Sequence, residues 1–226
     1  MKRVITTLLA ALLVLSLAAC GSRVETKKLA GTWTCTIDVT DRMNAAAEQA
    51  LGLSAADGTA QMPLQLVLTV TEDGAYTLRY DSDAARTALD AYAAALHPAA
   101  VESVYAAAEE QGLSREEYDA AMEKAGITMD DMVAAIFAGV DEEELLSLLT
   151  GRSAALTGYC RAEGGQLYLA DTAAELAETA DCLSYTLSDG TMTWTDAQGE
   201  LSSQLTEQEQ ELLRVPLTWT KQEESK

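Results

Sequence analysis

The chain has a single histidine among its 226 residues, and this shortage limits the chemistry it can perform. His97 lies in an alanine-rich stretch directly before Pro98, with no second histidine for acid–base work or a metal site. The serine elbow of hydrolases, the Walker loop, the His-Glu-x-x-His motif and the dinucleotide glycine pattern are also absent. Paired carboxylates could act as in glycosidases, but the many acidic residues make any chosen pair uninformative. We therefore expect no enzymatic activity, no catalytic residue and no cofactor.

Cysteines are few, and none of them form a Cys-x-x-Cys pair. A structural zinc site and a thioredoxin-like redox centre are therefore not expected. The chain has four cysteines, and if the thiol of Cys20 is acylated, as considered below, at most one disulfide can form among Cys35, Cys160 and Cys182. Three buried, small apolar side chains fit their spacing equally well.

Basic residues are also scarce, since 15 Lys and Arg stand against 36 Asp and Glu, giving a formal charge of −21. A field of this sign repels phosphate backbones, so nucleic acid is not an expected partner. The acidic run from Asp141 to Glu144 lacks the ligand spacing and central glycine of a calcium loop. A helix start, where acidic residues are favoured, explains the run without a metal.

One long apolar run is present, from Val4 to Ala19 behind Lys2 and Arg3, and no second one follows. It ends in Leu17-Ala18-Ala19-Cys20, which resembles the lipobox of bacterial lipoproteins. An ordinary signal peptide and an uncleaved membrane helix are the alternatives. The resemblance implies that residues 1–19 are removed and that Cys20 carries acyl chains such as palmitate. The protein would then be anchored to the cell membrane and face the extracytoplasmic side.

Both flanks of the remaining chain alternate apolar and polar residues, as half-buried strands do. Tight turns are indicated by glycine-containing triplets at 72–74, 163–165 and 188–190. The pattern predicts eight strands, at 31–39, 64–71, 75–81, 155–162, 166–170, 183–187, 191–195 and 217–220. In the 64–81 hairpin, Leu64, Leu66, Leu68 and Val70 are expected to share a face with Tyr76, Leu78 and Tyr80.

Eight short strands in hairpin order predict an α+β protein built on an up-and-down antiparallel barrel, with an open or strongly curved sheet or a sandwich as the alternative. The first strand carries Gly31 and Trp33 in a Gly-x-Trp arrangement. Together with the strand count and the late strand at 217–220, this resembles the lipocalin-like lipoproteins. The resemblance implies a barrel that binds a small molecule.

The middle of the chain is helical in character, and its capping signals mark separate helices. Ser114 with Glu117, Thr128 with Asp131 and Asp141 with Glu144 each have the spacing of a helix start. The predicted helices are 84–96, 99–111, 115–125, 129–138 and 142–149, with shorter ones at 43–51, 172–180 and 203–213. We expect the five to form an insertion between the third and fourth strands, packed on itself or on the barrel mouth.

The predicted organisation follows from these signals. It comprises a signal peptide at 1–19, an anchor and linker at 20–28, the first part of the barrel at 29–82, the helical insertion at 83–154, the second part of the barrel at 155–221 and a polar tail at 222–226.

The best candidates for binding are large side chains on the predicted inward faces, which an eight-stranded barrel uses either as packing or around one small ligand. They are Trp33, Tyr76, Tyr80, Tyr185, Trp194 and Trp219, with Phe137 and Met132 expected at an opening covered by the helices. Two hypotheses follow: a membrane-anchored barrel that binds a lipid or another hydrophobic small molecule, or a non-catalytic envelope protein whose acidic insertion docks a protein partner.

Overall fold

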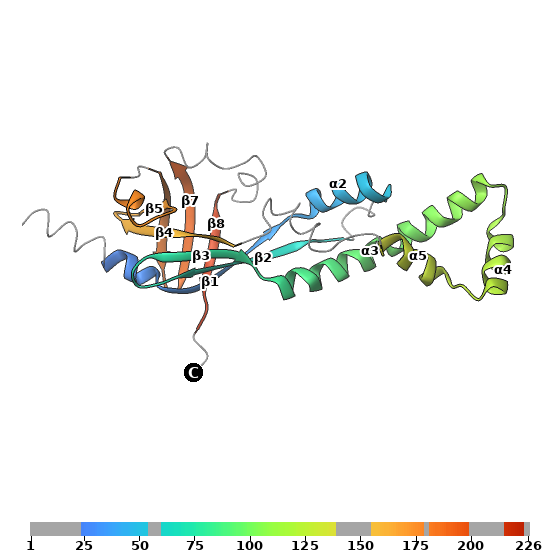
Figure 1. Cartoon of the computed structure of the whole chain (residues 1–226), viewed down its shortest axis with the longest axis horizontal. Coiled ribbons are helices and arrows are strands. Elements are labelled where there is room, and N and C mark those ends of the chain that lie inside the picture. Colours follow the sequence, from blue (N-terminus) through green and yellow to red (C-terminus); the bar gives the residue numbers. More distant parts are fainter. Residues whose placement is uncertain (1–23, 54–59, 139–154, 179–180, 199–214, 224–226) are drawn as a thin grey trace, which may run out of the picture. The chain divides into compact units, whose positions relative to one another are not determined.

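The structure is a computed structural model, and it describes residues 24–53, 60–138, 155–178, 181–198 and 215–223. The chain divides into two compact units. The first comprises residues 1–35, 66–80 and 154–226, and the second comprises residues 36–65 and 81–153. The strands are β1 (Gly31–Asp38), β2 (Pro63–Val70), β3 (Ala75–Tyr80), β4 (Leu156–Glu163), β5 (Gln166–Ala170), β6 (Cys182–Ser188), β7 (Thr191–Gln198) and β8 (Leu217–Lys221) (Figure 1).

The eight strands form one closed antiparallel barrel in sequence order, as predicted. Closure depends on the last strand returning to the first: Trp33 lies opposite Lys221, and Thr34 lies opposite Thr220. Each strand therefore has a neighbour on both sides, and the barrel has no open sheet edge. The open-sheet and sandwich alternatives are excluded.

Alternation along the strands sets which side chains enter the barrel. In the β2–β3 pair, Leu66 lies opposite Tyr80, Leu68 opposite Leu78, and Val70 opposite Tyr76. Residues opposite each other point to the same face, so the predicted common face of this hairpin is confirmed. A one-residue shift of register would move all of them to the outer face.

One end of the barrel is covered by the helical residues 24–29, which precede β1. The Thr26 hydroxyl accepts a hydrogen bond from the backbone N–H of Ala162 at 3.0 Å, and the Glu25 carboxylate accepts one from Gly164 at 2.8 Å. The three tight turns, β2–β3, β4–β5 and β6–β7, lie at this same end because the strands alternate in direction. The longer connections therefore all leave from the other end.

The second unit contains α2 (Thr40–Leu51), α3 (Ser82–Glu110), α4 (Arg115–Ala125) and α5 (Met129–Phe137). Its helices bury a small core of Leu53, Ala100 and Val133. The Tyr92 hydroxyl of α3 donates a 2.7 Å hydrogen bond to the Asn44 side chain of α2. The insertion between the third and fourth strands is thus confirmed, and α3 packs against both α4 and α5.

The prediction of a helix break at Pro98 is wrong, because 84–96 and 99–111 belong to the single helix α3. An internal proline costs about 3 kcal/mol through the lost hydrogen bond and the clash of its ring. Burial repeats every four residues across the proline, at Tyr92, Leu96, Ala100 and Val104. The apolar contacts of this stripe, together with the alanine-rich flanks, outweigh the local cost.

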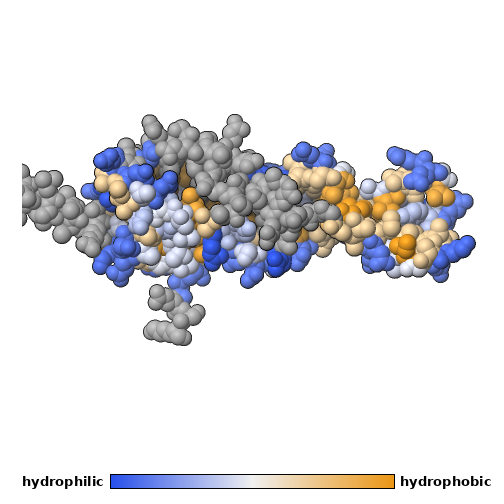
Figure 2. Space-filling view, in the orientation of Figure 1, coloured by the Kyte–Doolittle hydropathy of each residue, from blue (hydrophilic) through white to orange (hydrophobic). Residues whose placement is uncertain are grey.

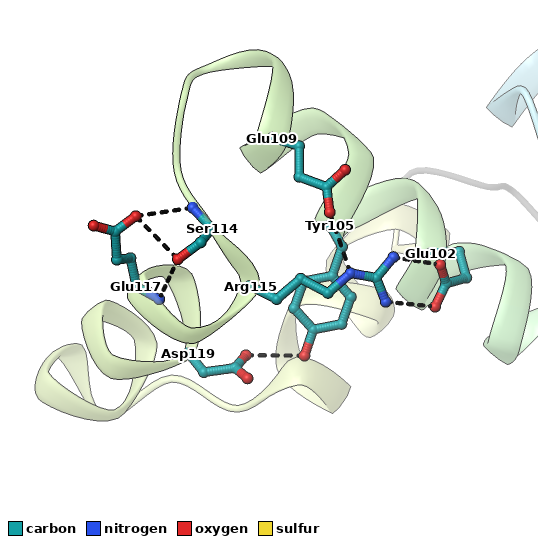
Figure 3. Close-up of polar contacts among 7 residues, drawn as sticks. All are labelled: Glu102, Tyr105, Glu109, Ser114, Arg115, Glu117 and Asp119. Atoms are coloured by element: carbon teal, nitrogen blue, oxygen red, sulfur yellow. Dashed lines mark hydrogen bonds and ion pairs between the residues drawn. The ribbon is translucent and has the colours of Figure 1, made fainter.

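The turn between α3 and α4 is stabilised by a polar cluster on the surface of the second unit (Figure 3). Arg115 donates two hydrogen bonds to Glu102, at 3.0 and 2.7 Å, and one to Glu109 at 3.2 Å. Its guanidinium lies 4.7 Å from the centre of the Tyr105 ring, whose hydroxyl donates to Asp119 at 2.9 Å. These bonds, all on exposed side chains, join α4 to α3.

Most predicted helix boundaries in this region hold. Ser114 with Glu117 and Thr128 with Asp131 form capping boxes, and Gly126 ends α4 in the left-handed conformation. Helix α2 begins at Thr40 rather than residue 43, and the predicted helix 172–180 is reduced to a short 3-10 turn, Glu175–Ala177. The predicted helices 142–149 and 203–213 lie outside the described residues.

Candidate ligand-binding site

Six of the eight candidate side chains lie in the barrel unit. Trp33, Trp194 and Trp219 are 1%, 3% and 0% exposed, so their rings are inside the barrel wall. Tyr76 is also buried, whereas Tyr80 and Tyr185 are half-buried. Each occupies an inward-facing position of its strand, because each lies opposite or alternates with other inward-facing residues.

Trp194 and Trp219 form the aromatic centre of the barrel. Their ring centroids are 4.8 Å apart and their planes are tilted by 48°. Adjacent strands bring them together: Met192 of β7 lies opposite Trp219 of β8, and Trp194 lies opposite Leu217. Tyr185 of β6 lies opposite Trp194 on its other side. Aromatic pairs in this arrangement add about 0.5–1.5 kcal/mol to the burial of their area.

The three indoles differ in how their N–H groups are satisfied. The Nε1 of Trp33 donates a 2.7 Å hydrogen bond to the backbone carbonyl of Leu29, in the helical residues that cover the barrel end. The Nε1 atoms of Trp194 and Trp219 are buried, and the structure gives them no hydrogen-bond partner. More than nine in ten buried polar groups in proteins have a partner. Two neighbouring donors without one therefore mark this part of the barrel as exceptional.

The ring of Tyr76 lies against Gly158 on the neighbouring strand. A Cβ at Gly158 would approach the Tyr76 ring to 2.9 Å and the Ala170 carbonyl oxygen to 2.5 Å, both too short. Gly158 lies opposite Tyr76 in the β3–β4 pair. The glycine thus provides the space that the tyrosine ring occupies on the inner face.

The described part of the barrel interior is apolar and contains no buried charged residue. Among the described residues, Thr26 is the one buried polar residue, and no charged residue is buried. Burial raises the pKa of the Cys160 thiol to about 12, which keeps it protonated at neutral pH. The pKa of Tyr185 is raised chiefly by burial, with Glu25 and Cys160 contributing. The described interior therefore offers apolar surface and indole N–H donors, but no charged partner.

Phe137 and Met132 belong to the second unit. Phe137 packs against the core of Leu53, Ala100 and Val133, and Met132 is half-buried on α5. Figure 2 shows apolar surface over α3 and α5 in this unit. That Phe137 and Met132 lie at an opening of the barrel stays a prediction.

The sequence also led to predictions about disulfides, metal sites and lipidation. Cys35, Cys160 and Cys182 are buried thiols, and none of these three forms a disulfide. Within the described ranges, no three His, Cys, Asp or Glu side chains gather as a metal site requires. None of the helices in the described part of the chain is long and apolar enough to cross a membrane. Cys20, the predicted lipidation site, lies outside the described residues.

The sequence did not indicate two residues that contact the barrel tryptophans, Met192 and Lys221. Met192 is 0% exposed and lies opposite Trp219, and its place two residues before Trp194 is the signal that could have found it. The Lys221 ammonium lies 5.3 Å from the centre of the Trp33 ring. Nothing in the sequence marks Lys221, because this contact exists only after the last strand pairs with the first.

No protein family, no curated protein and no solved structure matches the chain.

Proposed function

We propose that this protein is a membrane-anchored, lipocalin-like barrel that holds a lipid or another hydrophobic small molecule on the extracytoplasmic side of the cell membrane. One observation carries the proposal: two buried indole N–H groups lack acceptors inside a closed barrel whose described interior has no buried charge. An eight-stranded barrel either fills its interior with side chains or holds one small ligand. Unused donors favour the second possibility, because a filled core leaves few polar groups unpaired.

The proposed anchor is Cys20, on the strength of the Leu17-Ala18-Ala19-Cys20 motif. Removal of residues 1–19 takes away Lys2 and Arg3, leaving 13 basic residues against 36 acidic ones and a formal charge of −23. Such a surface is repelled by anionic lipid head groups, so acyl chains would have to provide the membrane attachment. The intact mass of protein from the membrane fraction should show loss of residues 1–19 and addition of acyl chains, and Cys20→Ala should abolish both.

Native mass spectrometry tests the binding proposal directly. A form lacking residues 1–19 and carrying Cys20→Ser would be purified gently and weighed under native and then denaturing conditions. Extra mass that disappears on denaturation supports a bound hydrophobic molecule and reveals its chemical class. A bare mass that stays unchanged after incubation with a membrane lipid extract would overturn the proposal.

A second candidate function rests on α4, which buries none of its residues. The helix is nevertheless capped at both ends and joined to α3 through Arg115, so its position in the second unit is defined. Leu113 and Ile127, which flank it, are 39% and 41% exposed. An ordered, acidic helix that buries none of its residues suits a protein partner of opposite charge, and Leu113 and Ile127 mark its two ends.

Photocrosslinking tests this second function. A photoreactive residue at Leu113 or Ile127 should capture one envelope protein in cells. The same residue at Thr186, an exposed position of β6, is the matched control and should not capture it. Equal capture from all three positions would argue against docking by α4.

A further inference from the structure

We infer that the molecule held in the barrel is uncharged and carries an oxygen acceptor, such as an ester, ketone or amide carbonyl, that takes hydrogen bonds from Trp194 and Trp219. This inference rests on the proposed function and specifies its ligand class. It is carried by the juxtaposition of two unpartnered indole donors whose rings are 4.8 Å apart in an uncharged interior.

The contrast with Trp33 explains why the protein itself does not satisfy these donors. Trp33 lies near the end of the barrel, where the Leu29 carbonyl of the covering helical residues reaches its Nε1. Trp194 and Trp219 lie within β7 and β8, which pair with each other over residues 191–194 and 217–220, so the backbone carbonyls between these two strands are used by that ladder. Leu217 and Met192, which lie opposite them, offer no strong acceptor, and the Tyr185 hydroxyl, although Tyr185 lies opposite Trp194, forms no hydrogen bond with its Nε1.

The charge of the ligand follows from what surrounds the two donors. A buried carboxylate is stable only with a cation or several hydrogen bonds to offset its lost hydration. No described charged residue is buried, Lys221 is exposed at the strand end near Trp33, and the chain as a whole carries −21. Two neutral N–H groups satisfy a carbonyl oxygen fully but a carboxylate only in part. A free fatty acid anion is therefore the poorer ligand.

The three tryptophans allow a direct measurement, because indole groups give separate proton–nitrogen NMR signals. The full chain, labelled with ¹⁵N-tryptophan and kept soluble by an amphipol, would be titrated with nonane, 2-nonanone and nonanoate. The Trp194→Phe and Trp219→Phe variants assign the signals. We expect 2-nonanone to move the Trp194 and Trp219 signals downfield, leave Trp33 in place and bind about tenfold more tightly than nonane. Nonanoate should bind less tightly than 2-nonanone.

Each contrary outcome identifies what has failed. Equal binding of nonane and 2-nonanone without indole shifts would overturn the inference while leaving the apolar-binding proposal in place. Tightest binding by nonanoate would overturn the neutral ligand. Indole signals of Trp194 and Trp219 already at a hydrogen-bonded position without ligand, and unmoved by any probe, would assign the donors to a trapped water or to Tyr185. No binding of any probe would overturn the proposed function itself. The wild-type titration needs no variant to fold.

Discussion

At the scale of single residues, the inner face of the barrel depends on the match between Gly158 and the Tyr76 ring. The glycine is not in the left-handed region, so its importance is one of space rather than of backbone conformation. An added methyl group would meet the Ala170 carbonyl and the tyrosine ring, neither of which is the far end of a flexible side chain. To accommodate the methyl group, β4 must shift away from the Ala170 carbonyl of β5, and the Tyr76 ring must move as well.

We therefore expect Gly158→Ala to lower the free energy of unfolding by about 1–3 kcal/mol, the range typical of overpacked cores. Urea unfolding followed by tryptophan fluorescence measures it, because all three tryptophans are in the barrel unit. Thr157→Ala, at the exposed neighbouring position on the outer face, is the control and should change little. If Gly158→Ala left the free energy of unfolding unchanged, the strands around Gly158 would be able to shift enough to accommodate the methyl group.

Cys160 provides a second test at this scale. The thiolate is the reactive form of cysteine, and burial raises the pKa of this thiol to about 12. Native protein at pH 8 should therefore leave Cys160 unlabelled by iodoacetamide, whereas urea-unfolded protein should react. Intact mass and peptide mapping give the answer, with an exposed Ser188→Cys as the reactive control. Rapid labelling of native Cys160 would mean that its surroundings are open to solvent.

At the scale of elements, the sequence was sufficient to predict a strand or helix where one face of the element is buried. It was also sufficient where a helix cap involves residues close together in the sequence. The alternation in β2 and β3 predicted their shared face because a shift by one residue would expose it. The Ser114 and Thr128 caps were predictable because they involve residues three apart. The prediction of two helices, 84–96 and 99–111, was wrong because the burial of apolar residues on both sides of Pro98 outweighs the local cost of an internal proline. The unpaired indoles could not be predicted, because which carbonyl reaches a tryptophan depends on the assembled barrel.

The α4 capping box leads to a prediction about pH. Hydrogen bonds from the backbone and hydroxyl of Ser114 hold the pKa of Glu117 below its usual value. A lowered pKa in the folded state stabilises the fold above the usual value and ceases to do so as pH falls through the lowered one. We expect Glu117→Gln, which keeps hydrogen-bonding atoms but no charge, to be less stable than wild type at pH 7 and equal to it at an acidic pH at which the Glu117 carboxyl is protonated in the folded protein.

The measurement is the urea unfolding midpoint from circular dichroism at both pH values. Glu116→Gln is the matched control, since it removes a charge from the same first turn without touching the box. At pH 7, Glu116→Gln should lower stability only through the lost interaction of its charge with the helix N-terminus, and this loss should be smaller than that of Glu117→Gln. A constant difference between Glu117→Gln and wild type at both pH values would contradict the role of the carboxylate.

At the scale of the whole molecule, the topology makes the helical insertion separable from barrel closure. The strands that border it, β3 and β4, pair directly, with Leu78 opposite Leu156. Antiparallel neighbours need only a short turn to connect them, so the insertion is not required to bridge a distance. The barrel closes through other contacts, between β1 and β8. The strand pairing that closes the barrel therefore does not depend on the insertion.

Replacing residues 82–154 by a short Asn-Gly turn should leave a folded barrel with buried tryptophans. Trp33, Trp194 and Trp219 all report on the barrel unit, and their emission should stay at the short wavelengths of buried indoles. Circular dichroism should at the same time lose the helical signal of α3, α4 and α5. Emission shifted to the long wavelengths of exposed indoles would contradict the prediction and show that the insertion stabilises the barrel. If the barrel folds without it but loses its bound molecule in native mass spectrometry, the insertion contributes to ligand retention.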